Sequence, residues 1–454
     1  MTTSAFGPAM VDSADLVVPI LGTPRIDSPL GEQLNQRVKS FHYAEESDRV
    51  LLDDTLSALV TRDRAPADLP GFEPAGPRRK IYFDPYKSRA GIVTCGGLCP
   101  GLNDVIRGLT LELCQRYGVQ HVYGFCNGFQ GFIAKFRRSV IDLTPQSVSN
   151  INELGGTILG SSRGEQDPGA IVDCLEQMGI NLLFVIGGDG TIKGAMSLVK
   201  EISARGDKIA VVGIPKTIDN DIMFIDQSFG FQTAFSEATK SLRAAHVEST
   251  GAPNGIGLVK LMGRHSGFIA CYSSLAMSDV NFVLIPEVPF KLEGDCGLLE
   301  VLRRRLERRG HAVVAIAEGA GQDLMEAEMS EMPGGATDAS GNKRLVDVGP
   351  WLRSRITSYF RSINMELNLK YIDPSYAIRS VPANPHDSVY CVRLAHYAVH
   401  AAMAGRTEVL IGRSRGRFVH VPMALAIRQR NKVDPHGDLW ESVLEATGQP
   451  RSFG

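Results

Sequence analysis

Long hydrophobic runs are absent from this sequence of 454 residues. No apolar run approaches the roughly 20 residues that span a bilayer. The first residues, MTTSAFGPAMVDSADL, have neither the basic start nor the apolar core of a signal peptide. An excess of charge is absent too, because 48 Lys and Arg oppose 50 Asp and Glu and leave a formal net charge of -2. These absences argue against a membrane or nucleic acid as a partner.

Cysteine is scarce: there are eight, most of them inside apolar segments. Such residues behave as buried free thiols in a reducing compartment, so we expect a cytoplasmic protein. No second Cys or His pair at metal-ligand spacing accompanies Cys95 and Cys99, which argues against a zinc site. An internal repeat of fixed period is also absent.

What the sequence does contain is a series of short apolar segments that alternate with helical ones. This alternation is typical of helices packed on both faces of a mostly parallel sheet. The length of the chain allows more than one such unit. We therefore predict an α/β fold of two doubly wound, mostly parallel-sheet lobes with the active site in the cleft between them. Strands are predicted over Ala90–Thr94, His121–Phe125, Leu182–Ile186, Ile209–Ile214, Gly255–Leu261, Phe282–Ile285, Val313–Ala317, Val409–Ile411 and Phe418–Val421.

The first 80 residues differ in character from the rest of the chain. They contain prolines, mixed charges and one predicted helix, Glu45–Thr61. The stretch Asp63–Lys80 has the composition of a linker. We predict no chemistry here and interpret the region as an arm used in packing between subunits.

The most informative stretch follows the predicted strand Ile209–Ile214. Lys216 and Thr217 come directly after its terminal proline, and Asp219 and Asp221 follow at alternate positions. Loops at the carboxyl ends of strands are where open α/β sheets place their chemistry. A lysine, a hydroxyl and two carboxylates suit phosphoryl transfer to a sugar hydroxyl, with one carboxylate taking the proton. On this segment alone, a polar turn with an aspartate at a helix cap stays an equal alternative.

Two glycine-rich turns early in the chain are suited to binding phosphate. Residues 95–104, CGGLCPGLND, place a strand, a glycine turn and a helix in the order that offers free N–H groups to an anion. This turn is neither a Walker A loop nor GxGxxG. In GGTILGSSRG, residues 155–164, Arg163 stands between small residues and suits phosphate oxygens. A packing turn without a ligand and a surface arginine are the respective alternatives.

Three later strands also end in polar residues. GGDGT, residues 187–191, places Asp189 at the start of a predicted helix, where a carboxylate suits magnesium beside a phosphate. A simple helix N-cap is the alternative. MGRHSGF, residues 262–268, flanks Arg264 with glycines, which suits a sugar phosphate or, equally, a tight turn with a solvated arginine. Glu318 stands at the carboxyl end of a further strand.

Taken together, these segments resemble the 6-phosphofructokinases. PKTIDND and MGR after GGDGT form a combination specific to that family, and the resemblance covers roughly residues 90–387. The matching motifs, in chain order, are CGGLCPGLN, LGSSRG, GGDGT, PKTIDND, FGFQTA, MGRHSGF, AEGAGQD and YIDPSYAIR.

The resemblance implies roles for individual residues. Asp219 is implied to be the base that takes the proton from the sugar 1-hydroxyl, with Thr217 and Arg264 as further catalytic residues and Asp221 shaping the pocket. Magnesium (Mg2+) is implied at Asp189. ATP binding is implied for Gly97, Arg163, Gly164, Gly188, Asp189, Gly190 and Thr191. Fructose 6-phosphate binding is implied for Thr217, Ile218, Asp219, Met262, Gly263, Arg264, Glu318, Tyr376 and Arg379.

Two positions bear on the phosphoryl donor. ATP-using members of the family carry glycine where this chain has Gly190, whereas pyrophosphate users usually carry aspartate, whose charge would repel the α-phosphate of a nucleotide. Lys216 is usual in the pyrophosphate-dependent branch. The combination is similar to the ATP-using members of that branch in plants and trypanosomatids. Allosteric control is implied, but not by the scheme of simple bacterial enzymes, which place an arginine where this chain has Gly255.

The sequence therefore predicts an ATP-dependent 6-phosphofructokinase of glycolysis that acts on fructose 6-phosphate and ATP with Mg2+. The alternatives are a pyrophosphate-dependent phosphofructokinase and a non-catalytic regulatory subunit that binds sugar phosphates. A homo-oligomer, dimer or tetramer, is expected. The predicted domains are an N-terminal extension over 1–80, a nucleotide-binding lobe over 81–231 completed by about 387–435, a fructose 6-phosphate-binding lobe over 232–386, and a C-terminal tail over 436–454.

Overall fold

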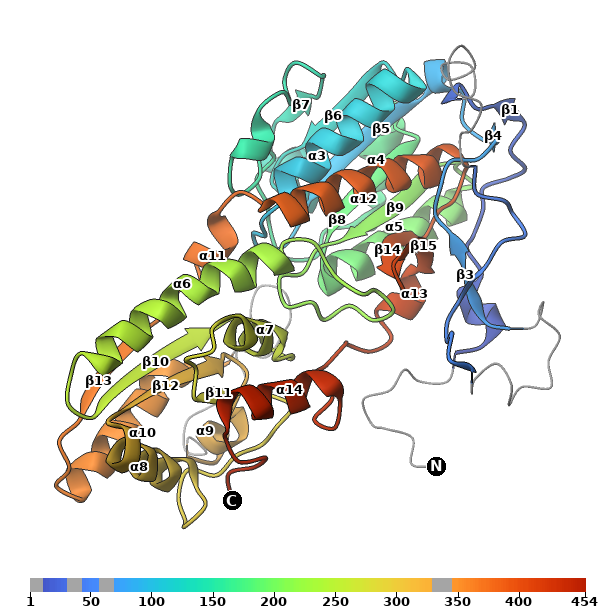
Figure 1. Cartoon of the computed structure of the whole chain (residues 1–454). Coiled ribbons are helices and arrows are strands. Elements are labelled where there is room, and N and C mark those ends of the chain that lie inside the picture. The colour runs from blue at the N-terminus through green and yellow to red at the C-terminus, as the bar shows by residue number, and fades with distance from the viewer. Residues whose placement is uncertain (1–10, 31–42, 57–68, 329–344) are drawn as a thin grey trace.

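The computed structural model describes residues 11–30, 43–56, 69–328 and 345–454. These residues form two α/β lobes, one above the other in Figure 1. The larger lobe is built on a nine-stranded sheet and the smaller lobe on a four-stranded sheet. The predicted α/β class is confirmed by this arrangement.

The strands of the larger lobe follow the order typical of an open sheet. From one edge to the other they are β2 (Val50–Leu51), β3 (Gly71–Pro74), β15 (Arg417–Pro422), β14 (Val409–Ser414), β9 (Ala210–Pro215), β8 (Leu182–Gly187), β5 (Arg89–Thr94), β6 (His121–Phe125) and β7 (Val140–Asp142). Strands β14 to β6 are parallel, which agrees with the prediction. Both edges are antiparallel, a feature that the sequence did not reveal.

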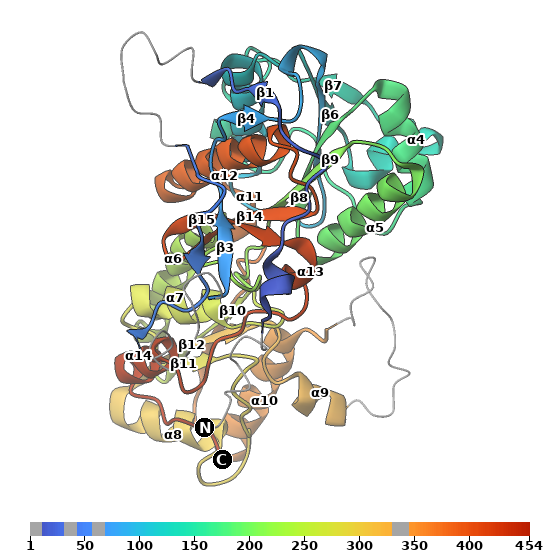
Figure 2. The same ribbon diagram turned by 90° about the vertical axis from the view of Figure 1, so that its right-hand side faces the viewer.

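Helices cover both faces of the larger sheet (Figure 2). On one face lie α3 (Leu102–Leu111) and α12 (Pro385–Met403), and on the other lie α4 (Pro168–Met178) and α5 (Asp189–Arg205). Consecutive residues of β8 serve different cores, since Phe184 packs with the α3 and α12 side and Val185 with the α4 and α5 side. A strand buried on both faces reads as a continuous apolar run, which is why these strands were predictable.

The smaller lobe repeats this construction with four parallel strands. They are, in order, β11 (Phe282–Leu284), β12 (His311–Ala317), β10 (Gly255–Leu261) and β13 (Asn368–Ile372). One face is covered by α6 (Phe231–Thr250) and α7 (Phe268–Ala276), and the other by α8 (Leu298–Arg309) and α10 (Val348–Ser362). Val259 and Leu258 face these two cores respectively.

Shorter elements complete the described part of the chain. A pair of strands, β1 (Ile26–Asp27) and β4 (Lys80–Ile81), lies beside the larger lobe. The remaining helices are α9 (Gln322–Glu328), α11 (Ala377–Ser380), α13 (Met423–Ala426) and α14 (Asp438–Thr447), with 3-10 turns at 13–16, 85–87, 128–132, 134–136 and 151–153 and a π-helical turn at 112–117.

The predicted helix Glu45–Thr61 is wrong over residues 45–55, and residues 57–61 lie outside the described ranges. Val50 and Leu51 instead pair with β3 as a short strand. Tertiary pairing overrides the local helix propensity here. The partner strand itself joins the larger sheet through β15, where Glu73 pairs with buried Arg406 and His420.

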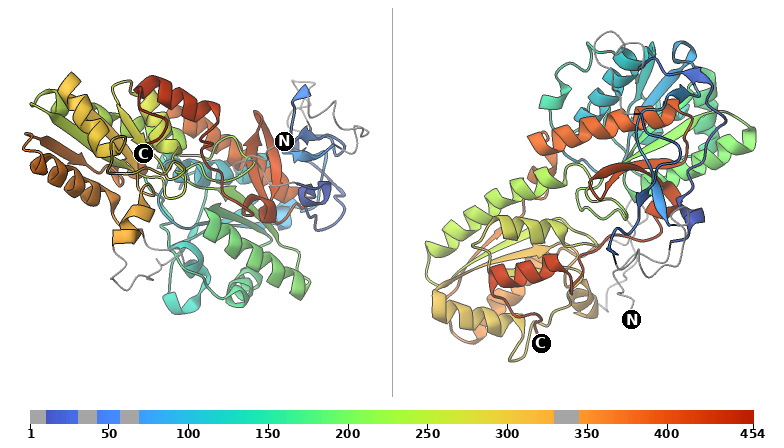
Figure 3. Two further views of the ribbon diagram at one scale, coloured as in Figure 1. Left: turned by 90° about the horizontal axis from the view of Figure 1, so that it is seen from below. Right: turned by 45° about the vertical axis from the view of Figure 1, so that its right-hand side comes forward.

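Within the described residues, the chain passes between the lobes three times: from β9 to α6, from β13 through α11 to α12, and from α13 to α14. The last passage, residues 427–437, runs along the junction (Figures 1 and 3). The residues assigned to a C-terminal tail belong to the smaller lobe, where α14 packs on α7 and β11. Phe453 is buried in that lobe's core, and Gln449 exchanges hydrogen bonds with the backbone of Val283.

Candidate active site

The carboxyl ends of the parallel strands of both lobes point toward their junction. In the larger lobe, the register pairs Thr94 with Ile186 and Gly187 with Pro215, so the turns after β5, β8 and β9 lie side by side. In the smaller lobe, Leu261 pairs with Ala317, which aligns the turns after β10 and β12. Every sequence-predicted site residue lies in or next to these turns or follows β13, except the Arg163–Gly164 loop.

Asp219 joins the two lobes. Its carboxylate Oδ2 accepts a hydrogen bond from the backbone N–H of Arg264 at 3.4 Å, and its carbonyl accepts one from Ser266 Oγ at 3.1 Å. Its other carboxylate oxygen, Oδ1, is buried and accepts no hydrogen bond within the described part of the chain. A buried acceptor without a donor is costly in a folded protein, so such an oxygen indicates a position prepared for a ligand.

The turn that carries Asp219 is held by its own side chains. Thr217 Oγ1 accepts a hydrogen bond from Asp219 N at 3.2 Å and donates one to Asp221 Oδ1 at 2.7 Å. Burial, the nearby charges of Asp221 and then of Glu318 raise the pKa of Asp219 well above the ordinary carboxyl value, while the hydrogen bond from Arg264 opposes them. A carboxyl group tuned in this way suits general-base chemistry near neutral pH.

Three cationic side chains surround Gly97. Lys216 is buried and its Nζ donates to the carbonyl oxygen of Gly97 at 2.7 Å. A Cβ atom added at Gly97 would lie 3.5 Å from Arg163 Nη2 and 3.9 Å from Arg379 Nη1. Arginines that converge on a bare backbone turn are suited to phosphate oxygens. Burial, more than the charge of Arg163, lowers the pKa of Lys216.

The GGDGT segment forms the N-terminus of α5. Gly188 is the N-cap, Asp189 is the first helical residue and Thr191 is buried in the first turn. Gly190 lies in the helix, its φ is not positive, and a Cβ atom there would meet nothing within 4 Å. Neither strain nor crowding therefore requires glycine at position 190. Gly164 differs, because its φ of 94° favours glycine in the exposed loop after Arg163.

A residue that the sequence did not reveal completes the larger lobe's edge. Arg430 Nη2 lies 2.8 Å from Asp189 Oδ2, and its Nη1 lies 3.1 Å from Asp221 Oδ2. One guanidinium therefore bridges two carboxylates from neighbouring turns. Arg430 stands in an ordinary polar stretch, IRQRNKV, with no motif to mark it. Its position depends on a backbone bridge to Ile222, far away in the sequence.

This pair of carboxylates fits magnesium. Magnesium usually keeps several waters and binds through one or two carboxylates plus substrate phosphates. Asp189 and Asp221 already share a cationic partner, which shows that the position between them attracts positive charge. Over the described ranges, no group of three or more His, Cys, Asp and Glu side chains forms a metal site by itself. The donors present thus match a metal that arrives with a nucleotide.

The turn after β10 is shaped by glycines. Gly263 has a φ of 132°, and a Cβ atom there would lie 2.5 Å from the carbonyl oxygen of Ser266. A Cβ atom at Gly319 would lie 2.1 Å from the carbonyl oxygen of Arg264. Because glycine has no Cβ atom, the turn of Arg264 can lie directly against the turn of Glu318. Burial raises the pKa of Glu318, and the charge of Arg264 is the largest opposing influence.

The remaining predicted residues line the same junction. Ile218 is buried and Met262 packs against the same apolar cluster, so both have a structural role. Tyr376 is 74% exposed, and the guanidinium carbon of Arg379 lies 4.8 Å from the centre of its ring. Arg379 therefore stands between an exposed aromatic ring and the turn of Gly97.

Comparison with known proteins agrees with this arrangement. Residues 89–402 match the family described as Phosphofructokinase. The chain belongs to the phosphofructokinase family. It is 56% identical over 441 residues to the ATP-dependent 6-phosphofructokinase of Amycolatopsis methanolica, covering 97% of this chain and 96% of that protein. It is 51% identical over 383 residues to ATP-dependent 6-phosphofructokinase 7 of Arabidopsis thaliana, covering 84% and 78%.

A solved structure shares the fold of this phosphofructokinase family member. The pyrophosphate-dependent phosphofructokinase from Marinobacter aquaeolei superposes with a TM-score of 0.63, covering 81% of this chain and 93% of that chain, at 21% identity. This likeness concerns the fold alone. The predicted resemblance to the family, plant members included, is confirmed by the relatives above.

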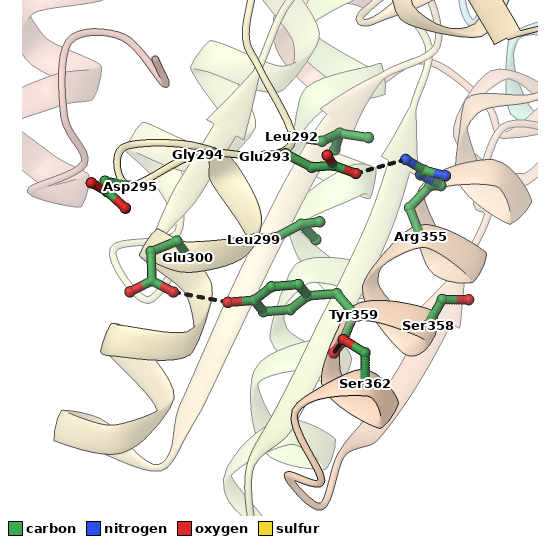
Figure 4. Close-up of a pocket in the computed structure, with 10 residues that line it drawn as sticks. All are labelled: Leu292, Glu293, Gly294, Asp295, Leu299, Glu300, Arg355, Ser358, Tyr359 and Ser362. Carbon is green, nitrogen blue, oxygen red and sulfur yellow. Dashed lines mark hydrogen bonds and ion pairs between the residues drawn. The ribbon is translucent and has the colours of Figure 1, made fainter.

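A cavity of about 520 Å³ lies in the smaller lobe, away from the strand ends (Figure 4). It is lined by the loop before α8, by the first turn of α8 and by α10, and there Tyr359 donates to Glu300 at 2.8 Å and Arg355 to Glu293 at 3.1 Å. None of the predicted site residues lines it. Within the described ranges, no helix has both the length and the apolar character that crossing a bilayer requires.

Proposed function

We propose that the protein is an ATP-dependent 6-phosphofructokinase, a phosphotransferase that moves the γ-phosphate of ATP to the 1-hydroxyl of fructose 6-phosphate and releases fructose 1,6-bisphosphate and ADP. The observation that supports it most is Asp219, a buried carboxylate at the junction of the lobes with one oxygen left without a donor. A sugar hydroxyl would supply that donor. The names of the relatives, at 51–56% identity, point to the same activity.

Asp219 is assigned as the general base. It takes the proton of the 1-hydroxyl as the oxygen attacks the γ-phosphorus, and the raised pKa increases its strength as a base. Thr217 holds the turn through Asp221, and the backbone N–H of Arg264 fixes the orientation of the carboxylate. Proton transfer of this kind typically contributes about 10²–10⁴ in rate.

We assign the two substrates to the two lobes. The larger lobe would bind ATP through the N-terminus of α5 and the exposed loop of Arg163, with Lys216 beside the transferred group. The smaller lobe would bind fructose 6-phosphate through Arg264 and Glu318, and Arg379 would reach the junction from the end of β13. In-line transfer needs donor and acceptor on opposite sides of the γ-phosphorus, which two facing strand edges provide.

Asp189 is assigned to hold magnesium, with Asp221 close by. When bound, magnesium supplies neutralisation of the charge on the β- and γ-phosphates. Asp189 and Asp221 would hold the metal, and the helix N-terminus would offer its free N–H groups to the polyphosphate.

The donor assignment rests on Gly190. Open space around this position leaves room for the α-phosphate of a nucleotide, and no side chain charge opposes it. The free state of all eight cysteines fits a reducing compartment, which supports a cytoplasmic location. A homo-oligomer, dimer or tetramer, and allosteric control stay predictions, to be measured by sedimentation and by initial rates with metabolite effectors.

A coupled assay with purified protein tests the proposal. Fructose 6-phosphate is supplied with either magnesium and ATP or magnesium and pyrophosphate, and formation of fructose 1,6-bisphosphate is followed. Activity with ATP and little with pyrophosphate is expected. A preference for pyrophosphate would establish the pyrophosphate-dependent alternative, and activity with neither donor, together with sugar-phosphate binding, would establish the regulatory one.

A further inference from the structure

The third passage between the lobes is fixed at both of its ends. On the larger lobe, Asn431 N donates to the carbonyl oxygen of Asp221 at 2.8 Å, and Arg430 forms an antiparallel bridge with Ile222. On the smaller lobe, Val433 N donates to Glu287 Oε1 at 2.9 Å. Arg430 is therefore held by the backbone on both sides, and its approach to the site is built into the path of the chain.

The side chain of Arg430 lies between two carboxylates that repel each other. The side chains of Asp221 and Asp189 are 9% and 22% exposed, and that of Arg430 is 31% exposed. Without a cation at this position, two partly buried negative charges would lie unbalanced at the strand ends.

We propose that Arg430 occupies the position that a divalent cation takes between Asp189 and Asp221, so that the nucleotide-free protein excludes free magnesium and admits it only together with ATP. This inference rests on the proposed function, because that function is what brings magnesium and ATP to this edge. Arg430 is thus a specificity-determining residue for the form in which the metal enters.

The exclusion follows from charge. A divalent ion placed beside a guanidinium is repelled, and the two also compete for the same carboxylate oxygens. A unit charge about 4 Å from a divalent ion weakens its binding by about 30-fold even at an effective dielectric of 80, and by more at lower dielectrics. The polyphosphate of ATP removes this barrier, because its oxygens offer the guanidinium new anionic partners. The Arg430 side chain is 31% exposed, so a ligand can reach it from solvent.

A tether between the lobes is the competing explanation of the same contacts. It predicts that removing the charge of Arg430 loosens the junction and leaves metal binding without nucleotide unchanged. The neighbouring Arg428 separates the two explanations, since it lies in the same segment but pairs with Asp15 at 2.5 Å, away from Asp189.

The test titrates Mn²⁺, followed by its paramagnetic resonance signal, into the full-length protein without nucleotide or sugar phosphate. Wild type is compared with Arg430→Gln, with Arg428→Gln and with the double variant Arg430→Gln, Asp189→Asn. We expect Arg430→Gln to bind Mn²⁺ at least about 30-fold more tightly than wild type, Arg428→Gln to match wild type, and the double variant to lose the gain.

Several outcomes would overturn the inference. Wild type and Arg430→Gln titrating alike would do so, as would a gain that survives Asp189→Asn. Tight Mn²⁺ binding by wild type without nucleotide would do so even if Arg430→Gln failed to fold. The same preparation of wild type is assayed for fructose 6-phosphate kinase activity. If wild type is active but Arg430→Gln binds Mn²⁺ no more tightly than wild type, this inference alone is wrong. If Arg430→Gln binds Mn²⁺ more tightly as expected but wild type is inactive, the proposed function alone is wrong.

Discussion

The turns after β9 and β10 meet at Asp219 yet are built in opposite ways. The turn after β9 is acidic, and its side chains bind one another: Thr217 bridges to Asp221, which in turn pairs with Arg430. The turn after β10 is basic and depends on its backbone, because Gly263 has a conformation that other residues rarely adopt. The first turn is specified by charge and the second by shape.

This difference indicates a division of work between the lobes. Burial and the neighbouring charge of Asp221 raise the pKa values of Asp219 and Asp189, and acidic groups gathered at one edge need cations, which suits proton transfer and metal binding. A glycine-rich turn that presents Arg264 suits the binding of an anion. Substitutions in the first turn are therefore expected to change rate, and substitutions in the second to change affinity for the sugar.

The largest effect is expected from Asp219→Asn, which removes the proposed base and keeps the shape of the turn. We expect kcat to fall by about 10²–10⁴ and KM to change little, because a base acts on the proton in the transition state. Initial-rate kinetics in both substrates measures this. A variant that kept nearly full kcat would show that Asp219 is not the base and that the acidic turn does not carry the catalytic step.

The same variant has an expected effect on stability. The pKa of Asp219 is raised in the folded protein, so its charge opposes folding at every pH above the unfolded-state value. Asn removes that charge, and the free energy of unfolding at neutral pH is therefore expected to stay the same or rise. Denaturant unfolding of the ligand-free protein measures it, and a large loss would mean that Asp219 serves the fold.

Gly190→Asp adds a negative charge to the acidic edge of the larger lobe and so tests whether charge at that edge controls ATP binding. A carboxylate within about 4 Å of the α-phosphate adds roughly 1–4 kcal/mol of repulsion, so ATP affinity is expected to fall by about ten-fold to several hundred-fold. Affinity for fructose 6-phosphate should not change. Direct titration of each ligand separates the two, and some activity with pyrophosphate is expected to appear, since Lys216 is already present.

Gly190→Ala is the control for this charge. The space around Gly190 is open and its position is helical, so alanine is expected to bind ATP like the wild type and to fold at least as stably. Equal loss of ATP affinity in both variants would show that bulk, and not charge, is excluded there.

Arg264→Ala is expected to weaken the binding of fructose 6-phosphate and to leave the binding of ATP unchanged. Hydrogen bonds to a charged group contribute roughly 1.5–3 kcal/mol, so fructose 6-phosphate should bind about 10- to 150-fold more weakly. ATP affinity should be unchanged when titrated without the sugar. Arg264→Lys keeps the charge but loses the planar fork, and only partial rescue is expected. Loss of ATP affinity in the alanine variant would show that Arg264 also contributes to ATP binding, which contradicts the assignment of one substrate to each lobe.

The smallest effect concerns pH. Because the pKa of Asp219 is raised, the acid limb of kcat/KM should lie above the value of about 3.9 that an ordinary aspartate gives. Asp221 is the largest charge that raises it. Asp221→Asn should therefore favour the ionised form of Asp219 and move the acid limb to lower pH, whatever happens to the maximal rate. An acid limb at the same pH in wild type and Asp221→Asn would show that burial, and not the charge of Asp221, sets the pKa of Asp219.

Much of the fold was predictable because its central strands are buried on both faces. His121–Phe125 and Gly255–Leu261 have the predicted bounds, and Ala210–Pro215 differs from its prediction by one residue at each end. The antiparallel edges were missed, because strands such as Gly71–Pro74 are short and acquire a partner only when the chain returns. Their pairing is long-range, and no local pattern encodes it.

The candidate site divides in the same way. The motif residues could be found because each follows a strand, and the carboxyl ends of parallel strands must gather at one edge. Arg430 could not be found, because nothing in its neighbourhood distinguishes it from the other arginines of the C-terminal segment. Glu287 likewise acquires its place by accepting hydrogen bonds from Gly267 and Val433, on two distant segments.

The strand order of the larger sheet has a consequence for synthesis of the chain. Within the described ranges, the strand Gly71–Pro74 pairs with β2 and β15, and Glu73 lies 333 positions before its partner Arg406. On the ribosome, this strand cannot join the larger sheet until nearly the whole protein has emerged. Domains tend to fold from the N-terminus during translation, but this early strand is among the last to find its place. A nascent chain halted before Val409 should leave Gly71–Pro74 open to protease, and one released at full length should protect it.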